Sequence, residues 1–140
     1  MIDAQSRRLA VYGLAVDAER VLLARIARGF PGAGRWTLPG GGLEWGESPI
    51  EGLRREVFEE TGTEVTVAEP IELFSVVVTA PDGAAIHSFQ LVYRVELIGE
   101  LRVEESGSTD AVAWHRLDFL PSMVSLVPRS LDAWSVQSSR

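Results

Sequence analysis

Residues 41–63 read GGLEWGESPIEGLRREVFEETGT, and this stretch decides how the rest of the chain is interpreted. Ser48 is followed three residues later by Glu51, a spacing that forms a capping box at the start of a helix. Gly62 suits the left-handed position that closes a helix. The stretch therefore predicts a helix over residues 48–61.

Three apolar residues of this helix, Ile50, Leu53 and Val57, recur at helical spacing, so we expect them to face the core. Gly52 lies inside the helix, where glycine costs about 0.5–1 kcal/mol relative to alanine. We therefore expect Gly52 to permit close packing against a sheet.

The acidic residues near the end of the helix break local rules. Glu56, Glu59 and Glu60 share one side of the last turns, and like charges at this spacing destabilise a helix by about 0.2–0.5 kcal/mol per pair. They also meet the negative end of the helix dipole. A divalent cation would convert this repulsion into attraction, because carboxylate oxygens are hard ligands suited to Mg²⁺ or Mn²⁺. The alternative is an ordinary solvated acidic face.

Length and composition define the class of protein. The chain has 140 residues, of which 46% are hydrophobic and 24% charged, so we expect one globular domain over residues 1–140. Cysteine and lysine are absent, which excludes thiol nucleophiles, zinc–thiolate clusters and Schiff-base chemistry. The net charge of −7 argues against nucleic-acid binding, and it suggests that a cation bridges the chain to any anionic substrate.

The sequence shows no membrane or targeting segment. No apolar run reaches the 18 or so residues that a membrane span needs. The N-terminal stretch lacks a cleavage site of small residues, so a signal peptide is not expected. We predict a cytoplasmic protein.

Outside the helix, apolar runs and turn signals alternate along the chain. Pro39 leads into three consecutive glycines, which we expect to form a loop able to approach a ligand closely; a plain turn is the alternative. The expected strands cover 8–16, 21–27, 35–38, 64–79, 84–98 and 111–116, and one or two short helices are expected in 118–136. The order of elements predicts an α/β (α+β) fold with a mixed β-sheet and helices packed on it.

Seven positions share a spacing that the rest of the chain does not repeat. They are Gly41, Glu47, Arg55, Glu56, Glu59, Glu60 and Gly62, with Val57 in an apolar slot. This pattern resembles the signature box of the Nudix (MutT-like) hydrolases, and the box occupies residues 41–63. The flanking GRWTLPGG and STDAVAW also resemble the family, whereas Thr63 replaces its usual aliphatic residue.

The resemblance implies a Nudix-type α/β/α sandwich that hydrolyses a nucleoside diphosphate linked to another group X. It implies Mg²⁺ or Mn²⁺ as cofactor, with Glu56, Glu59, Glu60 and the Gly40 carbonyl as ligands. Arg55 and Glu47 correspond to a supporting pair that orients the catalytic residues; an ordinary surface salt bridge is the alternative.

The sequence offers several candidates for the substrate contacts and for the general base. The backbone at Gly40 and Gly41 and the side chain of Arg35 are candidates to bind substrate, with a solvated arginine as the alternative. The residue that accepts a proton from the attacking water is left open among Glu56, Glu59, Glu104, Glu105 and Asp110.

We predict a metal-dependent diphosphatase acting on a (d)NTP or another small nucleotide derivative, with no nucleic-acid or membrane partner. The alternative function is a Nudix-fold domain that binds or senses a ligand without turnover, and an intact box argues against it. The sequence does not determine the X group or the number of metals, and a homodimer is compatible with it.

Overall fold

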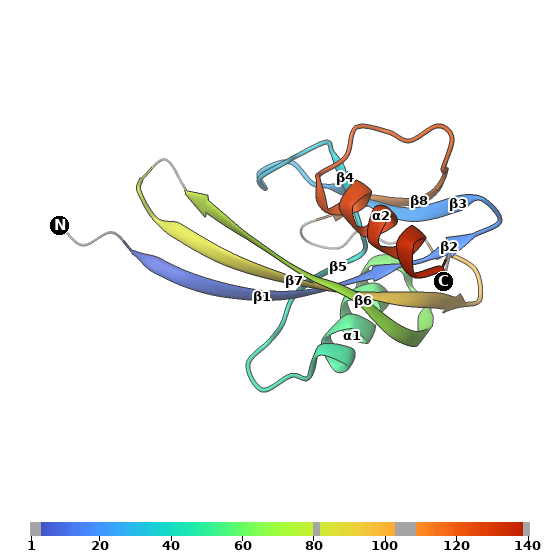
Figure 1. Cartoon of the computed structure of the whole chain (residues 1–140), viewed down its shortest axis with the longest axis horizontal. Helices are drawn as coiled ribbons and strands as arrows, with labels where there is room; N and C mark the ends of the chain where they lie inside the picture. Colours follow the sequence, from blue (N-terminus) through green and yellow to red (C-terminus); the bar gives the residue numbers. More distant parts are fainter. Residues whose placement is uncertain (1–3, 80–81, 103–108, 139–140) are drawn as a thin grey trace.

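The computed structural model describes residues 4–79, 82–102 and 109–138, and these form eight strands and two helices (Figure 1). In chain order the elements are β1 (Gln5–Leu14), β2 (Val16–Asp17), β3 (Arg20–Ile26), β4 (Trp36–Thr37), β5 (Gly40–Gly42), α1 (Pro49–Thr61), β6 (Glu64–Thr79), β7 (Ala85–Ile98), β8 (Thr109–Arg116) and α2 (Leu126–Ser138).

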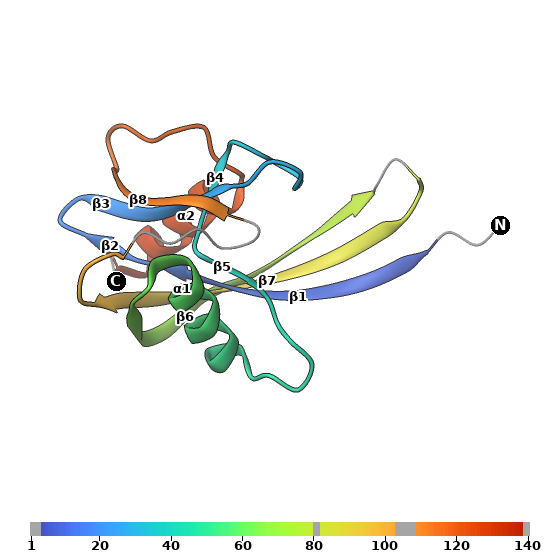
Figure 2. The ribbon, with the colours of Figure 1, turned by 180° about the vertical axis from the view of Figure 1, so that it is seen from behind.

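The larger sheet is mixed, as the sequence predicted. Its strand order is β5-β1-β7-β6. β1 runs parallel to β7 over its whole length, whereas β5 and β6 pair antiparallel to β1 and β7 respectively. A second, antiparallel sheet places β3 against β2, β4 and β8. Both views in Figures 1 and 2 show this second sheet beside one end of the first.

Two helices enclose these strands in an α/β/α arrangement, and each helix has its own buried cluster. The cluster at α2 joins Leu126 and Val127 to alternate residues of β1 and β3. The cluster at α1 joins Leu53 and Val57 to the intervening residues of the same strands. Residues 10–14 of β1 and 21–24 of β3 are buried on both faces, and these stretches contain no charged residue.

The helix α1 has the ends that the sequence predicted. The Ser48 hydroxyl accepts a hydrogen bond from the Glu51 N–H, and the Glu51 carboxylate accepts one from the Ser48 N–H. Gly62 adopts the left-handed conformation at the C-terminus. Leu53 and Val57 are buried, but the prediction that Ile50 faces the core is wrong, because its side chain, in the first turn, is 39% exposed.

Several boundaries differ from the predicted ones. The expected strand 8–16 is divided, because β1 ends at Leu14 and Val16–Asp17 joins the other sheet. The glycines after Pro39 form β5 instead of a loop, since they pair with Ala10–Tyr12 of β1. The tail forms the single helix α2, whose Pro128 falls in the first turn, where proline is tolerated.

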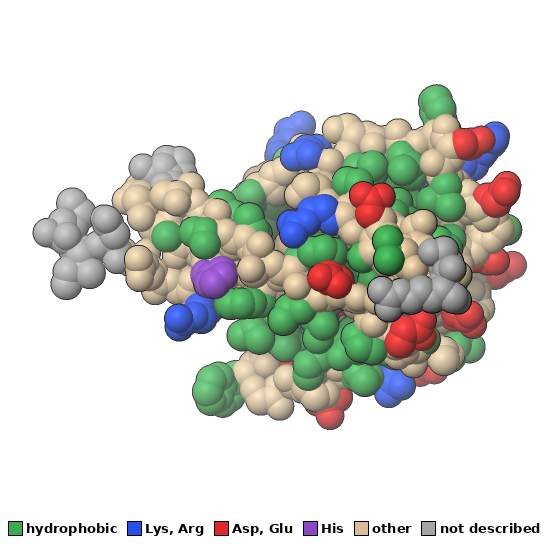
Figure 3. All heavy atoms as spheres, in the orientation of Figure 1, with side chains coloured by type: hydrophobic (Ala, Val, Ile, Leu, Met, Phe, Trp, Pro, Cys, Tyr) green, Lys and Arg blue, Asp and Glu red, His purple; other side chains and the backbone are tan. Residues whose placement is uncertain are grey.

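The surface carries two further features. Trp45 is fully exposed in the connection between β5 and α1. One end of the larger sheet projects past both helices, and in Figure 3 this end shows hydrophobic side chains scattered among polar ones. Within the described residues, no helix has the length and apolar character required to cross a bilayer.

Candidate active site

The strand β5 brings three glycines against the helix α1 and the strand β1. Gly40 has a φ of +148°, and a Cβ there would collide with the backbone carbonyl oxygen of Val11. Gly41 has an ordinary φ, but its Cβ would lie 2.8 Å from the Glu56 carboxylate. Glycine at these positions therefore permits a backbone strand to pass directly beside an acidic side chain of the helix.

A third glycine makes room for the connection between β5 and α1. A Cβ on Gly52 would collide with Leu43 and would lie 2.8 Å from Glu47 Oε1. The prediction that Gly52 packs against a sheet is therefore wrong. Its missing side chain instead lets the Glu47 carboxylate lie against the helix.

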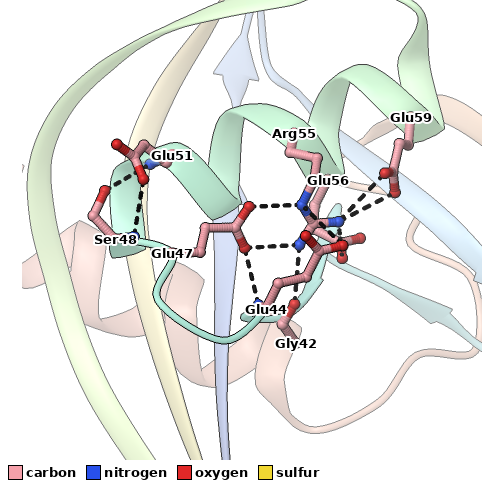
Figure 4. Close-up of polar contacts among 8 residues, drawn as sticks. All are labelled: Gly42, Glu44, Glu47, Ser48, Glu51, Arg55, Glu56 and Glu59. Carbon is pink, nitrogen blue, oxygen red and sulfur yellow. Dashed lines mark hydrogen bonds and ion pairs between the residues drawn. The ribbon is translucent and has the colours of Figure 1, made fainter.

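Arg55 is the centre of the polar network in Figure 4. Its Nε donates to one oxygen of Glu47 at 2.7 Å, and its Nη2 donates to the other oxygen at 2.9 Å. Nη2 also donates to the Gly42 carbonyl oxygen at 3.2 Å. The resemblance predicted a contact between Arg55 and Glu47, and the structure shows that it is two-pronged. It fixes the connection to the helix and to β5.

The remaining nitrogen of the Arg55 guanidinium faces the acidic end of the helix. Nη1 donates to Glu56 Oε1 at 3.0 Å and to Glu59 Oε1 at 3.3 Å (Figure 4). The like-charge repulsion inferred from the sequence is therefore partly offset by an arginine lying between the carboxylates. Glu56 is half-buried, whereas Glu59 is exposed.

Glu60 is more deeply buried than its two acidic neighbours, Glu56 and Glu59. Its side chain is buried, with 2% of the residue exposed. Oε1 accepts a hydrogen bond from the Gly40 N–H at 3.4 Å, and Oε2 is buried without a hydrogen-bond partner among the described residues. Burial, assisted by the charge of Glu56, raises the pKa of Glu60 well above its ordinary value.

The half-buried carboxyls of Glu56 and Glu47 have pKa values shifted in opposite directions. Burial also raises the pKa of Glu56, against the opposing influence of Arg55. Hydrogen bonds from Arg55 and from the Glu44 N–H lower the pKa of Glu47 to about 2. Glu47 is thus ionised at neutral pH and holds the arginine, whereas Glu56 and Glu60 form an acidic pair in a poorly solvated position.

The predicted metal ligands are brought together only in part. Across residues 4–79, 82–102 and 109–138, no three Asp, Glu or His side chains converge tightly enough to enclose a cation. The donor set still fits Mg²⁺ or Mn²⁺, because Glu60 presents an unpartnered buried oxygen beside Gly40 and all the candidate donors are oxygens. Mg²⁺ commonly completes its shell with water and substrate phosphates.

Other predicted residues lie away from this network. The Arg35 guanidinium donates to the Met123 carbonyl oxygen in the segment before α2. Asp110 forms an ion pair with Arg25 at 2.7 Å. Glu104 and Glu105 lie outside the described residues.

Two contacts of the site were not foreseen. The Gly42 carbonyl oxygen accepts from Arg55, and the Glu44 N–H donates to Glu47 at 3.0 Å. The three-residue separation of Glu44 and Glu47, within a turn, is the sequence signal that could have indicated the second contact.

Comparison with known proteins identifies the family. The model of the NUDIX domain matches residues 6–134, so the chain belongs to this family, as its sequence predicted. The MutT NUDIX hydrolase of Burkholderia pseudomallei has a similar solved structure, with a TM-score of 0.79 and 30% identity over 91% of this chain and 97% of that chain.

Two curated relatives match somewhat more than half of the chain. The oxidized purine nucleoside triphosphate hydrolase of Mus musculus is 37% identical over 83 residues, which are 59% of this chain and 53% of the relative. A MutT-like protein of Streptomyces ambofaciens is 42% identical over 81 residues, which are 58% of this chain and 47% of the relative. The chain spans about half the length of these relatives.

Proposed function

We propose that this chain is a metal-dependent diphosphatase that cleaves a diphosphate bond in a nucleoside diphosphate linked to another group. Its substrate would be a small nucleotide-type molecule in the cytoplasm. The family and the arrangement of the acidic residues around Arg55 support this proposal.

One observation carries most of the argument. Glu60 is buried beside Gly40, with one carboxylate oxygen unpartnered and Glu56 close enough to raise its pKa. An unpartnered buried carboxylate destabilises the folded state, so it calls for a function. A bound cation supplies the missing partner.

The roles of the residues follow from their contacts. Glu56, Glu59, Glu60 and the Gly40 carbonyl would hold Mg²⁺ or Mn²⁺, which neutralises charge on the diphosphate and lowers the pKa of bound water. Arg55 and Glu47 would be positioning residues. Their two-pronged contact fixes the segment from β5 to the start of α1, and it directs one guanidinium nitrogen toward Glu56 and Glu59.

Hydrolysis also requires a group to accept a proton from the attacking water. Glu56 and Glu59 lie at the site and are candidates for this role. Asp110 is engaged by Arg25, which makes it a less available base unless that ion pair opens. Gly40, Gly41 and Arg35 would bind the substrate, and Arg35 would have to release the Met123 carbonyl oxygen to reach the phosphates.

The names of the relatives suggest where to look for the substrate. The name of the mouse relative gives oxidised purine nucleoside triphosphates as its substrates. The similar solved structure from Burkholderia pseudomallei is also a MutT-type protein. Nucleoside triphosphates with normal and oxidised purines are therefore the first candidates for this chain.

The test is product release from a panel of nucleotide derivatives, measured with Mg²⁺, with Mn²⁺ and with a chelator. The panel contains dNTPs, oxidised dGTP, ADP-ribose, NADH, dinucleoside polyphosphates and nucleotide sugars. Chelator-sensitive cleavage of a diphosphate bond is expected, and Glu60→Gln should abolish it while Glu69→Gln, on the exposed part of β6, preserves it. Ligand binding without cleavage of any member would instead favour the sensor function.

A further inference from the structure

The strands β1, β6 and β7 extend well beyond the rest of the molecule and form a three-stranded arm. In Figure 1 this arm projects past α1 and past the second sheet, and β6 forms one of its two long edges. We define the distal edge as Leu73–Thr79 of β6. Leu73, Val76, Val77 and Val78 are between 39% and 61% exposed, so the distal edge presents apolar side chains to solvent.

The outer side of β6 has no strand beside it in the described part of the chain. β6 ends the strand order of the larger sheet, and its register is with β7 alone. An edge strand exposes a row of backbone N–H and C=O groups that can pair with another strand. Proteins usually protect such edges with charges, prolines, bulges or a covering segment.

Most of these protective features occur in the proximal half of β6, before Leu73. At the start of the distal edge, Phe74 is buried and the Arg129 guanidinium of α2 lies over its ring at 4.5 Å. Charged Glu69 and Glu72 flank Pro70, and the pairing with β7 shifts register on both sides of this proline. The Gln137 side chain of α2 donates to the Ile71 carbonyl oxygen at 2.7 Å. The distal edge, LFSVVVT, contains no charge and no proline.

We propose that the distal edge pairs antiparallel with the same edge of a second copy of this chain, which joins the two larger sheets into one. Pairing about a two-fold axis sets an uncharged apolar segment against itself. If the axis passes near Val76, the Glu72 residues lie beyond the ends of the paired segments, so like charges do not oppose one another. Each chain has one distal edge, so the assembly closes at two copies.

The length of the distal edge limits the area of the interface and therefore the affinity of the dimer. Seven paired residues span about 24 Å. An interface built on one such edge belongs to the small class, about 1,200 Å² or less, which favours weak association that depends on protein concentration. The inference concerns a surface remote from Arg55 and its carboxylates, so its outcome does not depend on the proposed activity.

The experiment combines sedimentation velocity with hydrogen exchange on the whole chain over a range of concentrations. A monomer–dimer equilibrium is expected, with amide protection of residues 73–79 increasing as the concentration rises. Val77→Lys should weaken the dimer by at least about tenfold, because symmetry places two like charges in one small interface. The matched control is Ile86→Lys, an exposed site on β7 between β1 and β6, which should change the affinity by less than about threefold.

Three results would overturn the inference. The first is a monomer at every concentration with exchange in the distal edge unchanged, a result that needs no variant and no test of folding. The second is equal weakening by Ile86→Lys and Val77→Lys, which would indicate packing of sheet faces. The third is growth of the wild-type chain into assemblies larger than dimers.

Discussion

Replacing Arg55 with lysine keeps the positive charge at the site but removes the planar guanidinium. The arginine makes two hydrogen bonds to Glu47, one to the Gly42 carbonyl oxygen and others to Glu56 and Glu59. A lysine ammonium is a point charge that cannot reproduce the two-pronged contact with Glu47 while also reaching the helix carboxylates. The variant therefore tests whether geometry, and not charge alone, organises the site.

The size of the effect follows from the hydrogen bonds that a lysine at this position cannot make. A hydrogen bond to a charged group contributes about 1.5–3 kcal/mol, and a neutral one about 1 kcal/mol. The side chains of Arg55 and Glu47 are 24% and 12% exposed, so solvent screens them in part. We expect the free energy of unfolding to fall by about 1–2 kcal/mol, which lowers Tm by about 3–8 °C for a domain of this size.

The assay is chemical denaturation together with turnover of the substrate found in the panel. Turnover of Arg55→Lys should fall by about 10–100-fold, as is typical when the partner of a metal ligand is disturbed. Arg54→Lys is the matched control, because Arg54 is the exposed neighbour on the same helix. If the two variants have equal stability and equal turnover, the orienting role assigned to Arg55 is incorrect.

Three further perturbations follow from the geometry. Gly40→Ala should cost about 3 kcal/mol or more of unfolding free energy, because its Cβ collides with the Val11 carbonyl at a φ that favours glycine, whereas Gly29→Ala, also at positive φ but in open space, should cost about 1 kcal/mol. The Glu47 pKa of about 2 lies below the ordinary 4.5, so its stabilisation is present above pH 4.5 and lost as the pH falls toward 2; Glu47→Gln should flatten this acid dependence in denaturation curves. The raised pKa of Glu60 destabilises the fold above pH 4.5, so with chelator present Glu60→Gln should increase the unfolding free energy by about 1–2 kcal/mol at pH 8 and leave it unchanged near pH 4.

Each of these has a clear contrary result. Equal stability of the two glycine variants would show that β5 can shift to accept a side chain. If Glu47→Gln and the wild type have the same acid-unfolding profile, the ion pair between Glu47 and Arg55 does not stabilise the fold. A decrease in the stability of Glu60→Gln at pH 8 would show that the carboxylate is satisfied in the folded chain.

The helix that carries the site was predictable because its signals are local. The capping box, the terminal glycine and the spacing of Leu53 and Val57 all act within one or two turns. The contact between Arg55 and Glu47 was predictable from the resemblance, because both residues belong to one short segment. The long strands β6 and β7 were also predictable, since only residues 80–84 separate them in the sequence.

The features that were missed depend on distant parts of the chain. Gly40–Gly42 form a strand because β1 supplies the partner about thirty residues earlier, and glycine itself has little preference for strands. Spacing placed Glu56, Glu59 and Glu60 on one side of the helix but did not separate the exposed Glu59 from the buried Glu60. Glu60 follows the buried Val57 by three residues and shares its face, whereas Ile50 is exposed because it lies in the first turn.

The central claim is that the acidic residues beside β5 bind a divalent cation, and a titration with Mn²⁺ followed by electron paramagnetic resonance tests it most directly. The wild-type chain and Glu69→Gln should bind Mn²⁺ saturably and with similar affinity, whereas Glu60→Gln should bind at least about tenfold more weakly. Equal binding by all three proteins, or no saturable binding by the wild type, would contradict the claim.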